Sequence, residues 1–303
     1  MAPGIPPSNL DELRRAVDRL PDPGRAPAAP VRPVALPARP GRPAATPTVS
    51  RPPARQAPAT PPPSPTPIPA IQVVGLTKKY RGTPAVDGLS FTVPRGKVTA
   101  FVGPNGSGKT TTIRMLLGLV RRDGGDATVL GTSVDHPSGY LGRVGALIEA
   151  PAFEPELDGR RNLLVLAALS GTPDARVAAA LDLVGLGKAG RKPYRAYSLG
   201  MRQRLGIAAA LLGDPHLLIL DEPTNGLDPS GIQEMRGLLR GLASSGKTVF
   251  VSSHLISEVE QLCDHLVVIR EGALVYQGTP KQLTAGGRRL EDAIVALTGR
   301  SSL

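Results

Sequence analysis

The sequence predicts an α/β fold with a parallel sheet at its centre, and three apolar stretches indicate it. Residues 98–102 and 217–220 are short runs of apolar side chains, and residues 248–251 form a third run. Strands that are apolar on both faces are typical of a parallel sheet covered on both sides. The first run leads through a glycine-rich loop into residues 111–120, where apolar side chains recur at helical spacing. We therefore expect each run to be a strand of one sheet.

The loop after the first strand carries the most informative motif of the chain. It fits the pattern G-x-x-x-x-G-K-[ST], in which backbone N–H groups and the positive end of the following helix bind phosphate groups. Lys109 would reach the β- and γ-phosphates of a nucleoside triphosphate, and the Thr110 hydroxyl would be a ligand of Mg²⁺. The alternative is a glycine turn with an exposed lysine, which the flanking strand and helix argue against. The residues assigned to nucleotide binding in this segment are Gly103, Pro104, Asn105, Gly106, Ser107, Gly108, Lys109, Thr110 and Thr111.

Polar residues follow the other two apolar runs directly. Asp221 and Glu222 end the second run, at the strand edge where open α/β sheets bind ligands. We expect Asp221 in the Mg²⁺ shell and Glu222 on the water that attacks the γ-phosphate; solvated acids at a strand end are the alternative. His254 follows the third run, so we expect it to contact the γ-phosphate rather than to be a structural or solvated histidine.

The first 69 residues differ in composition from the rest. They contain 21 of the 33 prolines and few large apolar residues, so burial cannot offset the chain entropy. We expect a disordered tail rich in Pro, Ala and Arg. Residues 9–20 have apolar side chains at helical spacing, but such a helix is too short to be stable alone. It would be either a frayed helix or a helix that docks on a partner.

Charge, cysteine content and hydropathy limit the possible partners. The net charge is +11, but basic residues form no stripe with aromatic residues, so we expect no nucleic-acid partner. The arginine-rich tail would contact anionic lipid or nothing. The single cysteine, Cys263, lies on the apolar side of a predicted helix and should pack in the core, and one cysteine suits a reducing cytosol. Neither a transmembrane run nor a secretion signal is present, so we expect the chain not to span a membrane.

The folded part should run from residue 71 to residue 303. A small antiparallel β-layer is expected before the phosphate loop, with Tyr80 in a loop between its strands. A helical subdomain is expected at about residues 152–212 and a hairpin with a closing helix at about 265–299. The remaining expected elements are strands at 71–76, 86–93 and 127–131, a turn at 123–126, a hairpin turn at 271–272 and a helix at 290–297. Residues 160–187 are expected to be helical, with two apolar clusters, the second starting after Pro173 and ending at Gly185.

Residues 71–282 resemble the ATP-binding cassette of ABC transporters, because the family's motifs occur in order and at the family's spacing. The phosphate loop resembles Walker A, residues 217–222 Walker B, residues 225–228 the D-loop, residues 197–204 the signature and His254 the switch histidine. Tyr80 stands where the family stacks an aromatic ring on adenine. The resemblance implies a P-loop NTPase fold with ATP and Mg²⁺ as cofactors. It further implies nucleotide contacts from Tyr80, Glu149, Ser198, Gly200 and Asp228, and catalysis by Lys109, Glu222 and His254.

Two departures resemble one branch of that family, the cassettes that power drug, bacteriocin and antibiotic-resistance exporters of bacteria. Leu199 and Met201 replace a glycine and a glutamine of the signature, while Ser198 and Gly200 remain at an apparent helix N-terminus that can bind an anion. Glu149 stands in place of a glutamine. Its carboxylate could orient Mg²⁺ or water, but it adds negative charge beside a triphosphate.

The resemblance also implies the partners. ATP would be held between two cassettes, with Walker A from one chain and Ser198 and Gly200 from the other. This homodimer would act on a separate membrane permease at the cytoplasmic face of the cell membrane. Two alternatives are a soluble cassette acting on ribosomes or nucleic acid and a cassette that binds ATP without hydrolysing it. The first usually carries a second cassette or a long coiled coil, and the second usually lacks residues equivalent to Lys109, Asp221, Glu222 and His254.

Overall fold

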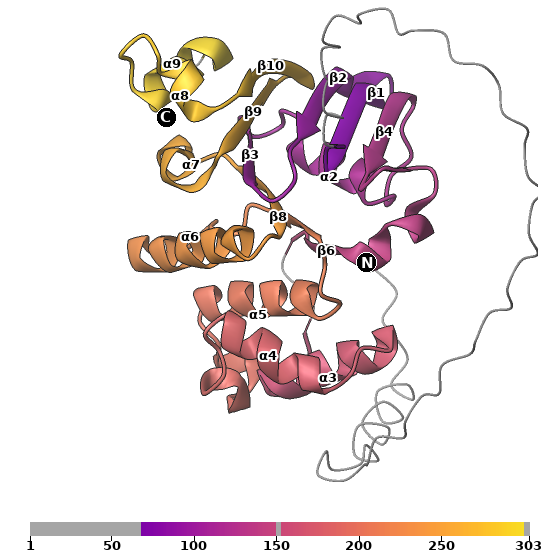
Figure 1. The fold of residues 1–303 in the computed structure, drawn as a ribbon, viewed down its shortest axis with the longest axis vertical. Coiled ribbons are helices and arrows are strands. Elements are labelled where there is room, and N and C mark those ends of the chain that lie inside the picture. The colour runs from indigo at the N-terminus through magenta and orange to yellow at the C-terminus, as the bar shows by residue number, and fades with distance from the viewer. Residues whose placement is uncertain (1–67, 150–152, 300–303) are drawn as a thin grey trace, which may run out of the picture. The chain divides into compact units, whose positions relative to one another are not determined.

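The structure is a computed structural model that describes residues 68–149 and 153–299 (Figure 1). Nearly all of the expected N-terminal tail, including the predicted helix at 9–20, lies outside the described residues. Within the described ranges, no helix is both long enough and apolar enough to cross a bilayer.

Two sheets form the framework. The smaller is antiparallel, in the order β2-β1-β4-β5, and the larger runs β10-β9-β3-β8-β7-β6 with every pair parallel except the β9–β10 hairpin. The expected antiparallel layer and parallel sheet are thus both present. The strands are β1 (Ile71–Tyr80), β2 (Thr83–Val93), β3 (Val98–Val102), β4 (Gly124–Val129), β5 (Thr132–Ser133), β6 (Val144–Leu147), β7 (Leu217–Asp221), β8 (Thr248–Ser253), β9 (His265–Arg270) and β10 (Ala273–Gly278).

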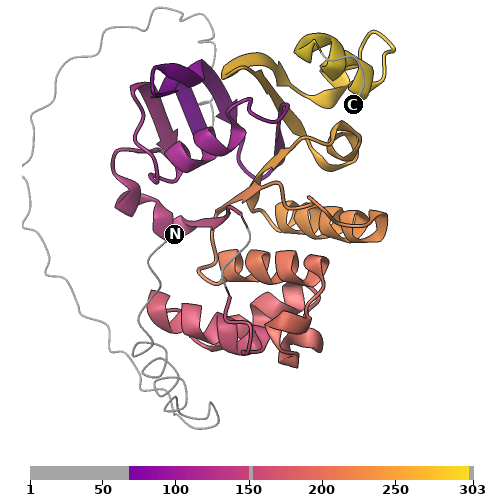
Figure 2. The same cartoon turned by 180° about the vertical axis from the view of Figure 1, so that it is seen from behind.

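Helices cover the larger sheet and extend away from it. Figure 1 shows α3, α4 and α5 packed together as a helical group, and the view from behind in Figure 2 shows the C-terminal helices beside the β9–β10 hairpin. The α-helices are α2 (Lys109–Leu116), α3 (Gly159–Ser170), α4 (Ala175–Leu183), α5 (Leu199–Leu211), α6 (Pro229–Ser244), α7 (Ile256–Leu262), α8 (Pro280–Leu283) and α9 (Leu290–Thr298). Short 3₁₀ turns are η1 (Pro137–Gly139), η2 (Leu141–Arg143), η3 (Ala189–Arg191) and η4 (Tyr194–Ala196).

The central strands bury both faces, as their sequence predicts. Alternate residues of β3 face opposite cores: Ala100 packs in the cluster that includes the helical group, and Phe101 packs in the cluster that includes the small sheet and α2. Phe101 stacks with Phe91 and Phe250, with ring centroids 5.4 Å and 5.2 Å away. Because such aromatic contacts join β2, β3 and β8, the small sheet is packed firmly on the strand that leads into the phosphate loop.

The expected loop around Tyr80 is wrong, since Tyr80 is the last residue of β1. The polar residues Lys78 and Lys79 stay in the strand because Asp123 binds both, accepting from the Lys78 side chain at 2.8 Å and from the Lys79 N–H at 2.7 Å. These hydrogen bonds lower the pKa of Asp123. The polar side chains of Lys78 and Lys79 suggested a loop, and only the structure shows the hydrogen bonds to the distant Asp123 that hold both residues in β1.

The expected turn at 123–126 is also wrong, because β4 begins at Gly124 and pairs with Thr77 of β1. Gly125 has φ +73°, and a Cβ on it would collide with the backbone of Gly75. The glycines that suggested a turn therefore allow two strands to approach closely. β4 therefore includes most of the strand expected at 127–131, but it ends at Val129.

Three helical boundaries differ from expectation as well. The helix expected at 111–120 begins at Lys109 and ends at Leu116, before Gly118 with φ +70°. The helical stretch 160–187 is two helices, as its two apolar clusters and Pro173 predict, but the second ends at Leu183 rather than at Gly185; Gly171 is the left-handed C-cap of the first. Cys263 is not inside a helix but follows α7 directly, and it is buried as expected.

Candidate functional site

Two glycines of the phosphate loop are required by its surroundings. Gly108 has φ +99°, and a Cβ there would collide with the carbonyl oxygen of Ala85 in β2. A Cβ on Gly103 would lie 2.5 Å from the carbonyl oxygen of Ile269 in β9. Because strands of both sheets touch the loop, it is held between them while Asn105 and Gly106 remain exposed at its tip.

Lys109 is buried beneath the loop with only 5% of its surface exposed. Its Nζ donates to the carbonyl oxygens of Gly103 at 2.8 Å and Pro104 at 3.3 Å. It also lies 3.4 Å from Oε1 of Glu222. A buried ammonium is stable only when paired in this way, so the loop and the second carboxylate are tied together through one cation.

The predicted Mg²⁺ ligands lie side by side. The Thr110 hydroxyl donates to Oδ2 of Asp221 at 2.7 Å, and the Ser252 hydroxyl donates to the other carboxylate oxygen. This arrangement follows from the parallel register, in which Asp221 of β7 pairs with Ser252 of β8. Sequence reasoning missed Ser252 in this role, although its place at the end of an apolar strand was a usable signal.

Glu222 is held on three sides. Its N–H donates to Oγ of Ser252 at 2.9 Å, its Oε2 lies 2.9 Å from Nδ1 of His254, and its Oε1 meets Lys109. It leaves β7 with φ +48°, an uncommon conformation for a residue other than glycine. Strain of this kind persists where the surroundings fix it and is common at active sites.

Tyr80 lies at the end of the strand pair that touches the phosphate loop, and Thr111 follows Thr110 directly. Tyr80 is 46% exposed, with Nζ of Lys78 5.6 Å from its ring centroid. It pairs with Thr83 where β1 turns into β2, two residues before the Ala85 carbonyl that touches the phosphate loop. Thr111 lies in the first turn of α2. An exposed aromatic ring near the loop is available for stacking on a base.

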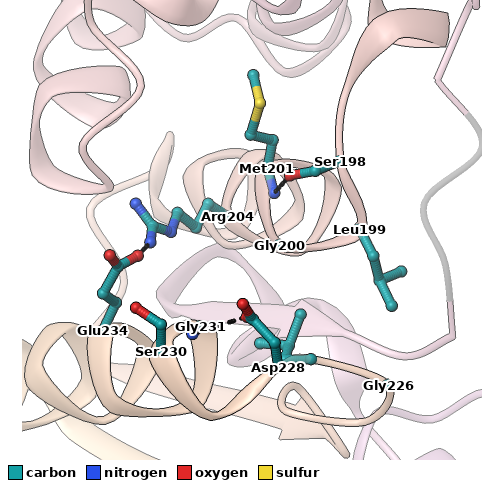
Figure 3. A pocket seen from close by; sticks show the side chains of 11 residues that line it. Ser198, Leu199, Gly200, Met201, Arg204, Gly226, Asp228, Ser230, Gly231 and Glu234 are labelled. Atoms are coloured by element: carbon teal, nitrogen blue, oxygen red, sulfur yellow. Dashed lines mark hydrogen bonds and ion pairs between the residues drawn. The ribbon is translucent and has the colours of Figure 1, made fainter.

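The signature residues form a second site, a pocket of about 490 Å³ between the N-terminal ends of α5 and α6 (Figure 3). Ser198 caps α5, its hydroxyl oxygen accepting from the Met201 N–H at 3.3 Å. Asp228 caps α6 by accepting from the Gly231 N–H at 3.0 Å. Gly200 lines the pocket without a side chain. The N-terminus of α5, whose cap is a neutral hydroxyl, is suited to an anion, whereas the Asp228 carboxylate already occupies the N-terminus of α6.

Leu199 and Arg204 also line this pocket. Leu199, which replaces a glycine of the resembling signature, lies over Gly226, where a Cβ would come within 2.9 Å of its Cδ2. Arg204, one helical turn after Gly200, forms an ion pair with Glu234 of α6 (Figure 3). The first signature residue, Tyr197, is buried and donates to the Ala189 carbonyl at 3.2 Å, and burial raises its pKa. The start of α5 is therefore anchored on both sides.

Glu149 has a cationic partner, which its place in the sequence did not indicate. It has φ +62° and forms an ion pair with Arg114 of α2. Sequence reasoning gave Arg114 no role, because nothing in the spacing links it to a residue 35 positions away.

The fold and the first cluster define a phosphate-loop nucleoside triphosphatase. A family model described as "ABC transporter" matches residues 86–225. The bacitracin transport ATP-binding protein BcrA of Bacillus licheniformis is 47% identical over 208 residues, covering 68% of this chain and 68% of that protein. The lantibiotic transport ATP-binding protein SrtF of Streptococcus pyogenes is 39% identical, covering 68% of this chain and 90% of that protein.

A solved structure agrees with these relatives. The structure of cbiO1 from Clostridium perfringens, described as part of an ABC transporter complex, superposes with a TM-score of 0.67 at 29% identity, covering 72% of this chain and 92% of that one. This chain belongs to the ATP-binding proteins of the ABC transporter family, and its cassette is an ATP hydrolase. The resemblance inferred from the motifs is confirmed, and the relatives favour a transporter subunit over a cassette that acts on ribosomes.

Proposed function

We propose that the chain is the ATP-hydrolysing subunit of an exporter and that it drives a separate membrane permease as a homodimer. The observation that carries the hydrolytic part is the continuous cluster at one sheet edge, in which Lys109 and His254 both meet Glu222 while Thr110 meets Asp221. The relatives, named as bacitracin and lantibiotic transport proteins, support export of an antibiotic or peptide.

In this proposal Glu222 is the general base. An attacking water would donate a proton to the Glu222 carboxylate, which His254 and the Ser252-bound backbone hold in one orientation. The γ-phosphate would replace Glu222 and the loop carbonyls as the partner of Lys109, so that the cation counters the charge that develops during transfer. His254 would then reach the γ-phosphate from the neighbouring strand.

The residues present fit a Mg²⁺ ion. The ion prefers one or two protein oxygens together with phosphate oxygens and waters, and the hydroxyl of Thr110 and the carboxylate of Asp221 converge within 2.7 Å. Among the described residues, no group of three or more His, Cys, Asp or Glu could hold a metal ion. When bound, Mg²⁺ would neutralise charge on the phosphates.

The second site would serve the partner cassette. The hydroxyl proton of Ser198 is free of its capping role, in which only the oxygen accepts, so it can donate to a γ-phosphate carried by the other chain. The N-terminus of α5 and the backbone at Gly200 add positive potential, and Asp228 holds the neighbouring helix end. ATP would thereby join two copies, and its hydrolysis would release them.

The permease would provide the membrane anchor and the substrate path. We place the chain at the cytoplasmic face of the cell membrane, with Tyr80 stacked on adenine and Glu149 between the nucleotide and the permease-facing helices α3 and α4. No nucleic-acid partner is proposed.

The test combines hydrolysis with recovery of the permease. The purified chain should release phosphate from ATP, and Lys109→Ala should abolish both binding and release. A tagged chain recovered from mildly solubilised host membranes should bring down a multi-span membrane protein encoded in the same cluster of genes. A chain that hydrolyses ATP without any such partner would contradict the transporter role.

A further inference from the structure

Three acidic residues follow two neighbouring strands at one sheet edge. In the parallel register of β6 with β7, Leu147 pairs with Leu220, on strands about 4.8 Å apart. Glu149 follows the end of β6, and Asp221 and Glu222 follow Leu220 at the end of β7. A triphosphate bound to the loop would meet that concentration of negative charge.

Each of the neighbouring acids has a partner that offsets its charge. Glu222 meets Lys109 and His254, and Asp221 accepts two hydroxyl hydrogen bonds. For Glu149 the partner is Arg114, in the last turn of α2. An unpaired carboxylate here would repel the triphosphate.

The position of Arg114 connects this ion pair to the phosphate site. It lies four residues after Thr110, so both side chains lie on one face of α2, about 6 Å apart along the axis. The same helix opens at the phosphate loop and contacts β7. One helix therefore carries Lys109, Thr110 and the cation that binds Glu149.

The ion pair between Arg114 and Glu149 is too exposed to contribute much to the stability of the fold. The Arg114 and Glu149 side chains are 40% and 68% exposed, and exposed pairs contribute at most about 1 kcal/mol to stability. An exposed pair also opens readily. Its effect should therefore be electrostatic and local to the nucleotide.

We propose that Arg114 is a positioning residue for the nucleotide site: it neutralises Glu149 and holds that carboxylate away from the triphosphate. The inference rests on the proposed placement of the triphosphate on the phosphate loop. Its consequence is that a carboxylate at residue 149 weakens ATP binding once Arg114 is removed. With glutamine at residue 149, Arg114 becomes dispensable for affinity.

A double-mutant cycle on the full chain tests this coupling. Binding of the slowly hydrolysed analogue ATPγS with Mg²⁺ is measured by titration calorimetry for the unaltered chain, Arg114→Ala, Glu149→Gln and the double variant. Arg114→Ala should weaken binding about three- to tenfold when Glu149 is present. It should change binding little in the Glu149→Gln background. The loss should shrink at high salt, because surface charges are then screened, and Arg114→Lys should restore most of the affinity.

A matched control tests whether the loss of any exposed ion pair weakens ATPγS binding. Arg176 is 41% exposed and pairs with Asp214, which is 62% exposed, so Arg176→Ala removes a similar pair on α4. It should leave ATPγS affinity unchanged. Thermal melting of each variant checks that the fold is kept.

The outcomes are distinct. Equal weakening by Arg114→Ala in both backgrounds would mean that Arg114 acts on the nucleotide or the fold without Glu149, and would overturn the proposal. No weakening in either background would overturn it as well. Failure of the unaltered chain to bind ATPγS would overturn the proposed function and this inference with it. Binding by the unaltered chain without coupling would overturn the inference alone.

Discussion

The ammonium group of Lys109 lies 3.4 Å from the carboxylate of Glu222. This contact joins the phosphate-binding lysine that follows β3 to the proposed general base that follows β7. Both side chains emerge at the same edge because β3 and β7 are each paired in parallel with β8. The chemistry of the site therefore depends on sheet register as much as on the motifs themselves.

Replacing Glu222 with glutamine should stop turnover without weakening ATP binding. The amide cannot accept a proton from water, so steady-state hydrolysis should fall by at least about a hundredfold. The amide also removes a charged competitor for Lys109, so ATP affinity should stay the same or rise. Phosphate release and calorimetry measure the two effects. Glu156→Gln, an exposed acid paired with Arg195, is the control, and full turnover in Glu222→Gln would remove that residue from the mechanism.

Thr110 should set the Mg²⁺ requirement. Thr110→Val keeps the shape of the side chain and removes the hydroxyl beside Asp221, so about tenfold more Mg²⁺ should be needed for half-maximal ATP binding. Thr110→Ser keeps the hydroxyl and should behave like the unaltered chain. Mg²⁺ is titrated at a fixed concentration of a fluorescently labelled ATP analogue, and binding is followed by the fluorescence of the label. Identical Mg²⁺ curves for the valine variant would exclude Thr110 as a ligand.

The sequence predicts those elements whose pattern is set by residues close together along the chain. The strand 98–102 matches β3 because all five of its residues are buried, and a run without charged positions is unambiguous. Gly124 was misassigned because its pairing partner, Thr77, lies far along the chain. The end of β1 was misassigned because Asp123, which binds Lys78 and Lys79, is equally distant. Local composition carries no information about such a partner.

The same distinction applies to the site. The phosphate loop, Asp221, Glu222 and His254 were predicted because each follows an apolar strand, and they meet at one edge. The contacts of Ser252 with Asp221, of Arg114 with Glu149 and of Arg204 with Glu234 join separate elements. Only the packed structure brings these groups together.

Tyr140 should stabilise the helix that begins at the phosphate loop. Its buried hydroxyl donates to the carbonyl oxygen of Leu116 at 2.8 Å, at the end of α2. Burial raises the pKa of Tyr140 to about 12, so the phenol stays protonated and able to donate at any pH used for purification. Tyr140→Phe should lower the free energy of unfolding by about 1 kcal/mol in urea titrations.

Tyr80→Phe is the matched control for that measurement, because Tyr80 is 46% exposed. Its unfolding free energy should stay within about 0.5 kcal/mol of the unaltered value. Equal stability of the Tyr140 and Tyr80 variants would show that the buried hydrogen bond contributes nothing.

The only cysteine should be unreactive in the folded chain. Burial raises the pKa of Cys263 to about 12, and because the thiolate is the reactive form, below that pH the thiol stays protonated as well as shielded. Iodoacetamide at mildly alkaline pH should therefore alkylate Cys263 rapidly in denaturant and very slowly without it, as followed by intact mass. Rapid labelling of the native chain would contradict the packing after α7.

The central claim is that ATP joins two copies of this chain, with the phosphate loop of one facing Ser198 and Gly200 of the other. The most direct test is light scattering of Glu222→Gln with and without ATP and Mg²⁺. Nucleotide should shift the mass from monomer to dimer, and Ser198→Arg, which blocks the N-terminus of α5, should abolish that shift. A mass that stays monomeric while calorimetry shows saturating ATP would mean that ATP does not join two copies of the chain.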